Sequence, residues 1–320
     1  MIRTSHSHLH VAAVTHPGMG GRQNEDRYSV SSYRVSAQDP TPSLFAIVSD
    51  GIGGHSSGEI AAEMAVETIS HMIAQSEASQ PLAILEHAIQ VTSDAIAIKA
   101  HENTQLVGMG TTCACVWVIG DQLYIASVGD SRIYLLRDGR ARQLTTDHTW
   151  VQEAVEKGIL DPQAARSHPN VHVIRRYLGS SRTPRADTRL RLAREESDAQ
   201  ARSNQGMQLQ PGDLLLLCSD GLTDEVSDEE ITELARGRNL QAAGRSLVEL
   251  ACARKGQDNI TAVLLLVPWT SAQAKRSSRF WVLALWGLFA LLLLVALIAL
   301  GSWLVFDVWQ PPPATPTPAL

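Results

Sequence analysis

The sequence predicts a layered α+β domain with antiparallel sheets, followed by one transmembrane helix. Three observations carry this prediction. Short apolar runs bounded by Gly, Asp and Pro recur along residues 1–267, two longer stretches of helical periodicity follow each other directly, and the residues from Phe280 to Phe306 carry no charge. Two successive helices between strands disfavour the strict βαβ alternation of a Rossmann-type sheet.

The individual elements follow from local patterns. Strands are predicted where apolar and β-branched residues form short runs, at 44–48, 111–119, 122–128, 133–137, 142–144, 213–218 and 260–267. Asp138-Gly139 separates two of these runs and is a hairpin signal, because both residue types tolerate positive φ. Helices are predicted at 59–73 and 83–99, where apolar residues recur three to four positions apart.

Two further stretches are predicted to lie outside the sheets. Residues 148–170 combine a short helical pattern with two proline-containing pairs, so we expect a flap beside the sheet that includes His148 and His168. Residues 194–206 are polar and almost free of large apolar side chains, which predicts a surface insertion. His6, His8 and His10 alternate and would share one strand face, but a frayed terminus is the commoner outcome.

The apolar run and its flanks predict a single-pass membrane protein. Lys275, Arg276 and Arg279 precede the run and no Lys or Arg follows it. Because cationic flanks stay on the cytoplasmic side, residues 1–267 are expected in the cytoplasm, anchored in the lipid bilayer of the cell (inner or plasma) membrane by residues 280–306. Residues 268–279 then form a basic juxtamembrane linker and residues 307–320 a proline-rich tail. A buried core helix is the alternative, but core helices rarely run this long without a charge.

The charge balance argues against a nucleic-acid partner. The formal net charge of the whole chain is −6, and without the apolar run and the tail it is −5, from 27 cationic and 32 anionic residues. A DNA- or RNA-binding role would require a concentrated positive surface.

Two segments of the chain resemble each other and end on a carboxylate. Five apolar residues precede Ser49-Asp50-Gly51, and five more precede Ser219-Asp220-Gly221. If the two strands are neighbours, their carboxylates lie a few ångströms apart, and like charges that close require a cation. The alternative for each Asp-Gly pair is a plain turn, as at Asp138-Gly139.

Other residues strengthen the cation hypothesis. Asp258 directly precedes the predicted strand 260–267, Glu25 and Asp26 are adjacent, and the glycines that follow Asp50 suit a backbone crowded against metal or phosphate. A set of oxygen ligands without His or Cys at ligand spacing favours Mg²⁺ or Mn²⁺ over Zn²⁺. Two such ions that share a carboxylate polarise a bridging water to hydroxide and orient it toward phosphorus. The sequence therefore predicts phosphoester hydrolysis.

The ordered set of motifs resembles the bacterial metal-dependent serine/threonine protein phosphatases, the PPM or protein phosphatase 2C-like family. The resemblance covers about residues 10–267. It rests on eight motifs in family order: Asn24-Glu25-Asp26, Val48-Ser49-Asp50-Gly51-Ile52-Gly53-Gly54-His55, Met109-Gly110-Thr111-Thr112, Val128-Gly129-Asp130-Ser131-Arg132, Thr146-Asp147-His148, Pro211-Gly212-Asp213, Leu217-Cys218-Ser219-Asp220-Gly221-Leu222 and Gln257-Asp258-Asn259-Ile260-Thr261. It implies a central β-sandwich of two antiparallel sheets flanked by α-helices, with the metals at one edge between the sheets.

The resemblance also implies roles for the metal-binding residues. Asp50 is similar to the carboxylate that bridges both ions, with the carbonyl of Gly51 on one of them. Asp220 and Asp258 resemble the ligands of the other ion. Glu25 and Asp26 resemble residues that act near the metals through bound water.

Three more residues match family positions, and two of them have an alternative interpretation. Asp130 matches the position that, with Asp220, holds a third and weaker ion, and its alternative is a turn that ends the strand 122–128. Arg22 is the expected ligand of the substrate phosphate, a bidentate task suited to guanidinium, although it lies one residue closer to Asn24 than the family spacing. His55 is either a general acid for the leaving alkoxide or a hydrogen-bonded loop histidine.

These expectations combine into one function. The resemblance implies a phosphatase that hydrolyses phosphoserine and phosphothreonine on proteins with a hydroxide bridging two divalent ions, opposing a membrane-anchored serine/threonine kinase. Two alternatives remain open: a scaffold protein that keeps the fold without activity, and a phosphatase for small phosphoesters. The presence of Asp50, Asp220 and Asp258 argues against the scaffold.

Overall fold

The computed structural model describes residues 1–21, 23–53, 57–165, 168–193, 195–236 and 239–269. The chain divides into two units, Met1–Pro268 and Trp269–Leu320, and every element below belongs to the first. Among the described residues, no helix is long and apolar enough to cross a membrane. The predicted span at 280–306, the tail that follows it and residues 270–279 of the predicted linker lie outside the described residues.

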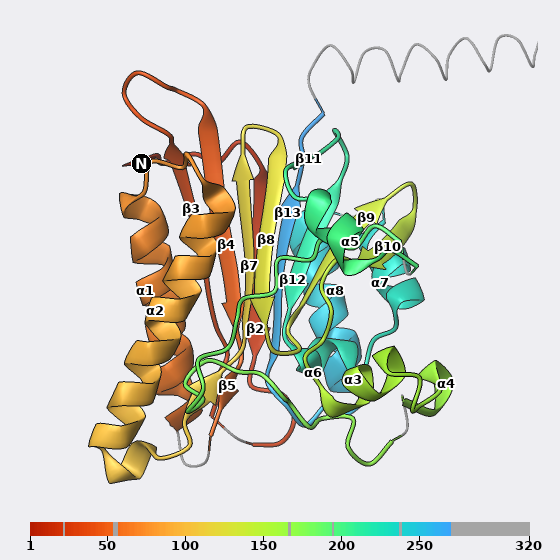
Figure 1. The fold of residues 1–320 in the computed structure, drawn as a ribbon. Coiled ribbons are helices and arrows are strands. Elements are labelled where there is room, and N and C mark those ends of the chain that lie inside the picture. Colours follow the sequence, from red (N-terminus) through yellow and green to blue (C-terminus); the bar gives the residue numbers. More distant parts are fainter. Residues whose placement is uncertain (22, 54–56, 166–167, 194, 237–238, 270–320) are drawn as a thin grey trace, which may run out of the picture. The chain divides into compact units, whose positions relative to one another are not determined.

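Two antiparallel sheets form the centre of the first unit (Figure 1). The first consists, in spatial order, of β1 (Ile2–Arg3), β3 (Arg27–Arg34), β4 (Pro42–Ser49), β7 (Cys113–Ile119), β8 (Gln122–Val128) and β11 (Met207–Gln208). The second consists of β10 (Arg140–Gln143), β9 (Arg132–Arg137), β12 (Leu214–Cys218), β13 (Ile260–Leu266) and β2 (His10–His16). A short ladder joins β5 (Gly51–Ile52) to β6 (Gly110–Thr111).

Helices cover the outer face of each sheet (Figure 1). α1 (Ser57–Gln75) and α2 (Pro81–Glu102) pack on the first sheet, and α7 (Asp228–Ala235) and α8 (Leu240–Ala253) pack on the second. Another apolar cluster fills the space between the sheets. The predicted β-sandwich with flanking helices is therefore confirmed. The remaining short elements are η1 (Thr104–Leu106), α3 (Trp150–Glu156), α4 (Pro162–Ala165), α5 (Asp198–Ser203) and α6 (Asp220–Thr223).

Strand β4 shows why residues 44–48 form an unbroken apolar run. Phe45 and Ile47 belong to the cluster under α1 and α2, whereas Leu44, Ala46 and Val48 belong to the cluster between the sheets. A strand that is buried on both faces has no polar side to alternate with. At about 25 cal/mol per Å² of apolar surface, each large side chain that is removed from water contributes roughly 2 kcal/mol.

Most of the predicted elements are confirmed to within three residues at their ends. This holds for both long helices and for all but one of the seven strands. The hairpin between β9 and β10 is also confirmed, because Asp138 and Gly139 adopt the positive φ angles of 53° and 72° that such a turn requires. The exception is the predicted strand 111–119, which is divided at Thr112 because its backbone N–H bonds to the carbonyl of Asp50 at 2.9 Å.

Two other expectations were wrong. The segment 194–206 is largely at the surface in its described residues, but it is not a simple loop: α5 begins with a capping box formed by Ser197 and Gln200, and Ala201 is buried. The three alternating histidines do not share a strand face either, since only His10 lies in a strand. His8 is partly buried, and desolvation lowers the pKa of its imidazole.

Candidate metal centre

Asp50 and Asp220 lie close together, but not for the predicted reason. The prediction required neighbouring strands, whereas Asp50 follows β4 in the first sheet and Asp220 follows β12 in the second. The two strands end at the same edge of the sandwich, near β5 and α6 (Figure 1). Desolvation raises the pKa of Asp220, and a side-chain hydrogen bond with Asp50 opposes that rise. Two carboxylates in such contact require either a shared proton or a cation.

Asp26 joins this pair from the loop before β3. Its side chain is 3% exposed, and its Oδ2 accepts a hydrogen bond of 2.7 Å from the hydroxyl of Ser219. Desolvation, and then the charges of Asp220 and Asp258, raise the pKa of Asp26 to about 7. Its Oδ1 is buried and has no hydrogen-bond partner among the described residues.

The backbone of Asp50 is held firmly by two threonines. Thr111 Oγ1 donates to the Asp50 carbonyl at 2.7 Å, and the Asp50 N–H donates to Thr112 Oγ1 at 2.9 Å. Desolvation, followed by the charges of Asp26 and Asp220, raises the pKa of the Asp50 carboxyl well above its usual range. In the absence of a cation, burial and the neighbouring carboxylates therefore disfavour the charged form of Asp50.

Gly51 and Glu25 occupy the crowded side of the site. A Cβ built on Gly51 would lie 2.4 Å from the backbone of Gly58, and one on Gly58 would lie 2.9 Å from Glu25 Oε2. Only glycine therefore allows β5 and the start of α1 to approach each other here. Glu25 is half-buried, and desolvation raises the pKa of its carboxyl.

Asp258 lies at the exposed rim and its loop is fixed by Asn259. The Asn259 side chain accepts a hydrogen bond from the Glu25 N–H at 2.7 Å and donates one to the Pro17 carbonyl at 3.1 Å. Gly18 packs against the same loop, since a Cβ there would lie 1.9 Å from the Asp258 carbonyl oxygen. These contacts connect the segments that carry Glu25 and Asp258.

Asp130 lies close enough to Asp220 for their charges to interact. It is 5% exposed, and its Oδ1 is buried without a hydrogen-bond partner among the described residues. Desolvation, and then the charge of Asp220, raise the pKa of Asp130 well above its usual range. The structure thus brings Asp130 to the carboxylate cluster. Asp130 also lies in the turn that ends β8, as the alternative interpretation required.

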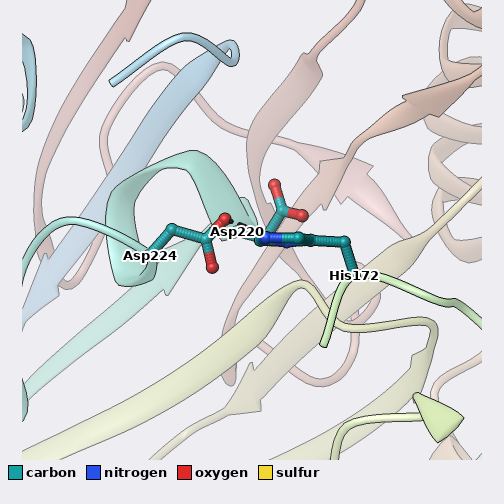
Figure 2. A group of neighbouring side chains, drawn as sticks. All are labelled: His172, Asp220 and Asp224. Carbon is teal, nitrogen blue, oxygen red and sulfur yellow. Dashed lines mark ion pairs between the residues drawn. The ribbon is translucent and has the colours of Figure 1, made fainter. Parts of the chain in front are cut away.

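Two residues that the sequence reasoning missed lie beside Asp220. His172 Nδ1 is 3.4 Å from Asp224 Oδ2, and one ligand atom each of His172, Asp220 and Asp224 all lie within 4.8 Å of one another (Figure 2). Desolvation and the charge of Asp220 raise the pKa of Asp224 to about 7. The sequence does contain a signal for Asp224: it lies four positions after Asp220, a spacing that puts both side chains on one face of a helical turn.

The remaining predicted residues, two of the site and two of the flap, have different outcomes. Arg22 and His55 lie outside the described residues. His148 was expected in the flap, but it is 2% exposed and hydrogen-bonded inside the domain. His168, by contrast, does lie in the predicted flap region, where its ring stacks on Trp150 with centroids 4.8 Å apart.

The donor set fits a divalent metal centre. Asp26, Asp130 and Asp220 each have one buried carboxylate oxygen without a hydrogen-bond partner in the described part of the chain. A buried, unpaired carboxylate oxygen costs free energy unless a cation compensates it. The surrounding donors are nearly all carboxylate and carbonyl oxygens, which Mg²⁺ and Mn²⁺ prefer.

The chain is similar to characterised proteins over most of the first unit. The family model of protein phosphatase 2C matches residues 19–264. The chain is 37% identical over 217 residues to the serine/threonine protein phosphatase PstP of Mycobacterium tuberculosis. This alignment covers 68% of this chain and 39% of PstP. The chain is also 33% identical over 262 residues to the serine/threonine phosphatase stp of Listeria innocua. This alignment covers 80% of this chain and 95% of that relative.

Solved structures agree with this relationship. The catalytic domain of PstP in complex with two manganese ions is 31% identical, has a TM-score of 0.65, and aligns over 82% of this chain and 99% of its own. The serine/threonine phosphatase of S. agalactiae is 29% identical, has a TM-score of 0.70, and aligns over 81% of this chain and 99% of its own. With the family model covering most of the first unit, the chain belongs to the protein phosphatase 2C family.

Proposed function

We propose that this protein is a serine/threonine protein phosphatase that uses two divalent ions, Mn²⁺ or Mg²⁺. The observation that supports it best is the contact between the carboxyl of Asp50 and that of Asp220, which come from opposite sheets. Without a metal ion, such a contact requires one of the two carboxyls to keep a proton at neutral pH, whereas a divalent ion allows both to be charged.

The ligand roles follow the resemblance. Asp50 would be shared by the two ions, the carbonyl of Gly51 would help to hold one of them, and Asp220 and Asp258 would help to hold the other. When bound, the ions lower the pKa of a shared water so that hydroxide is available at neutral pH. Glu25 and Asp26 hold the surrounding waters, and Asp26 Oδ2 is oriented for this by the hydroxyl of Ser219.

Arg22 and His55 complete the proposed chemistry. Arg22 binds the substrate phosphate through two parallel N–H donors and so orients phosphorus toward the nucleophile. His55 protonates the serine or threonine oxygen as the P–O bond breaks, which avoids an unstable alkoxide leaving group. No covalent bond to the protein forms in this reaction.

A third, weaker ion is proposed between Asp130 and Asp220. The partnerless oxygen of each residue supports this site. Asp224 and His172 lie close enough to Asp220 to add an oxygen and a nitrogen donor. The strength of this site depends on how the turn at Asp130 is held.

The substrates proposed are phosphoserine and phosphothreonine side chains of proteins. Relatives from M. tuberculosis and Listeria are named serine/threonine phosphatases, which supports this class. The test is release of phosphate from a phosphothreonine peptide by the full chain in mild detergent, with Mn²⁺ and with a chelator. Metal-dependent turnover supports the proposal. Absence of turnover favours a scaffold, and turnover of aryl phosphates without phosphopeptides favours a small-molecule phosphatase.

We further propose that residues 280–306 anchor the enzyme in the cell membrane, with the catalytic domain on the cytoplasmic side and a membrane-anchored serine/threonine kinase as its counterpart. The uncharged run and the cationic residues before it support this topology. Tethering would raise the local concentration of substrates at the same membrane. Cell fractionation of the full chain tests it, since a chain that ends at residue 270 should leave the membrane fraction.

A further inference from the structure

His148 is buried and uses both ring nitrogens, although the proposed chemistry gives it no part. Its Nδ1 accepts a hydrogen bond from the N–H of Gly129 at 3.0 Å, so the ring proton must lie on Nε2. Nε2 in turn donates to Asp187 Oδ2 at 3.1 Å. The two backbones are also joined, because the His148 N–H donates to the Gly129 carbonyl at 2.9 Å.

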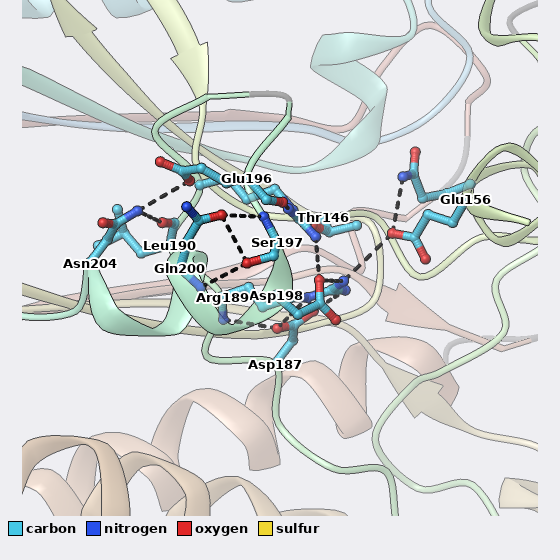
Figure 3. A network of polar contacts seen from close by, with 12 residues as sticks. Thr146, Glu156, Asp187, Arg189, Leu190, Glu196, Ser197, Asp198, Gln200 and Asn204 are labelled. Atoms are coloured by element: carbon cyan, nitrogen blue, oxygen red, sulfur yellow. Dashed lines mark hydrogen bonds and ion pairs between the residues drawn. The ribbon is translucent and has the colours of Figure 1, made fainter.

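Asp187 is fixed as a charged acceptor for this imidazole. Although desolvation opposes ionisation, hydrogen bonds from His148 and Arg189 hold the pKa of Asp187 well below its usual range. The Arg189 guanidinium binds both oxygens of Asp187 and is itself bound by Asp198 at the start of α5 (Figure 3). The segment 194–206, predicted as a mere surface insertion, therefore supports the acceptor of His148.

The residue that follows Gly129 is Asp130, and the turn that carries it is held from the other side as well. The hydroxyls of Ser131 and Thr112 are 2.7 Å apart, and Thr112 Oγ1 accepts the N–H of Asp50 at 2.9 Å. Gly129 has a φ of 104°, and a Cβ on it would lie 2.5 Å from the Thr112 side chain. Asp130 thus lies between a contact to His148 and a contact to the bridging carboxylate Asp50.

The backbone at His148 also holds the segment that follows His172. Its carbonyl accepts the N–H of Arg175 at 2.7 Å, and Thr149 forms a bridge with Ile174. His172, beside Asp224, lies just before this attachment. The imidazole of His148 therefore contacts the turn before Asp130, and its backbone contacts the segment that follows His172.

We propose that His148 is a positioning residue for the third-ion site: oriented by Asp187, it fixes the Gly129–Asp130 turn so that the Asp130 carboxylate is directed at the ion shared with Asp220. The inference rests on the proposed function, since it assumes that this site takes a divalent ion. His148 touches neither substrate nor metal. Removing its bond to Gly129 should weaken the ion at Asp130 and leave the two ions at Asp50 unaffected.

The test is a Mn²⁺ titration of the full chain in detergent, followed by electron paramagnetic resonance of free Mn²⁺, which needs no turnover. In His148→Leu, which removes the acceptor for the Gly129 N–H, the Kd of the weakest class of site should rise about tenfold or more, as is usual when a partner of a metal ligand is lost. His148→Asn, whose amide oxygen can replace Nδ1, should restore most of the affinity.

Two controls make the result specific. Asp213→Asn disrupts a comparable buried ion pair with Arg137 at the opposite end of β12, and it should change no Mn²⁺ affinity. In an Asp130→Ala background, which lacks the weak class, His148→Leu should have no further effect on Mn²⁺ binding.

Three results would overturn the inference: unchanged weak-class affinity in His148→Leu, an equal loss in all classes of site, or the same loss in Asp213→Asn. The proposed function fails in a different way. If the wild-type chain binds Mn²⁺ in these classes but releases no phosphate, the positioning role stands and the phosphatase activity does not.

Discussion

Ser219 donates a hydrogen bond of 2.7 Å to Asp26, and the second oxygen of that carboxyl is buried without a hydrogen-bond partner among the described residues. The bond joins the loop before β3 to the end of β12, and so connects the two sheets at the edge where the carboxylates meet. Asp26 is therefore both a structural link and a candidate member of the metal centre. Its raised pKa makes this dual role measurable.

The metal-free protein should lose stability as the pH rises from 5 to 8. The pKa of Asp26 is about 7 in the fold, whereas the ordinary pKa of an aspartate carboxyl is 3.8, so folding favours the protonated acid. This contribution to the free energy of unfolding is complete below pH 4 and is lost as the pH approaches 7. The loss is on the order of 2–4 kcal/mol. Thermal unfolding with a chelator should show a steeper decline for the wild type than for Asp26→Asn. Equal slopes would contradict the raised pKa.

Binding of Mn²⁺ at pH 7 should release protons. Asp26 and Asp50 have raised pKa values in the metal-free protein, because desolvation and neighbouring carboxylates disfavour their charged forms. Ligands must lose their protons to bind a cation. Isothermal titration calorimetry in two buffers of different ionisation enthalpy should give different apparent heats, and the difference should shrink at pH 8.5. Identical heats in both buffers at pH 7 would exclude protonated ligands.

Gly18→Ala should impair metal binding more than Gly21→Ala. Both glycines have positive φ, so both substitutions introduce backbone strain of about 1 kcal/mol. Only the Cβ at Gly18 would collide with the Asp258 carbonyl, whereas the Cβ at Gly21 meets no atom within 4 Å. Activity measured against Mn²⁺ concentration should need at least several-fold more metal in Gly18→Ala. A matching shift in Gly21→Ala would mean that strain, and not displacement of Asp258, is responsible.

Asp224→Asn should weaken the third-ion site selectively. Asp224 lies beside Asp220 and His172, and its pKa is raised to about 7, as expected for a carboxyl crowded by another acid. Replacing it with a neutral amide removes one charge from the site, so the weakest class of Mn²⁺ site should lose about tenfold in affinity. Metal titrations of the variant check this. If the affinity is unchanged, Asp224 is not a ligand of this site and only pairs with His172.

Much of the fold could be predicted because the local patterns agree with the tertiary structure. The apolar run 44–48 is unbroken because β4 is buried on both faces, and the Asp138-Gly139 hairpin needs only two residues with positive φ. The division at Thr112 could not be predicted, since it depends on the carbonyl of Asp50, sixty-two positions away in the chain. The capping box of Ser227 and Glu230, which starts α7, was a readable signal that was overlooked.

The site was predictable where a motif ends a strand, and less so elsewhere. Asp50 and Asp220 stand out because each follows five apolar residues and precedes a glycine. Their proximity, however, comes from two sheets that face each other, which no strand-pairing argument gives. The burial of His148 depends on Asp187, thirty-nine positions along the chain, so the sequence around the histidine alone suggested a flap.

The most direct test of the metal-centre account compares two single substitutions of aspartate in Asp-Gly pairs. Asp50→Asn removes the proposed bridge between two ions, whereas Asp138→Asn changes a hairpin residue whose positive φ suits asparagine. With saturating Mn²⁺ and a phosphothreonine peptide, kcat/KM should fall about a thousandfold or more in Asp50→Asn and stay within about twofold of the wild type in Asp138→Asn. Substantial Mn²⁺-dependent turnover by Asp50→Asn would contradict the account.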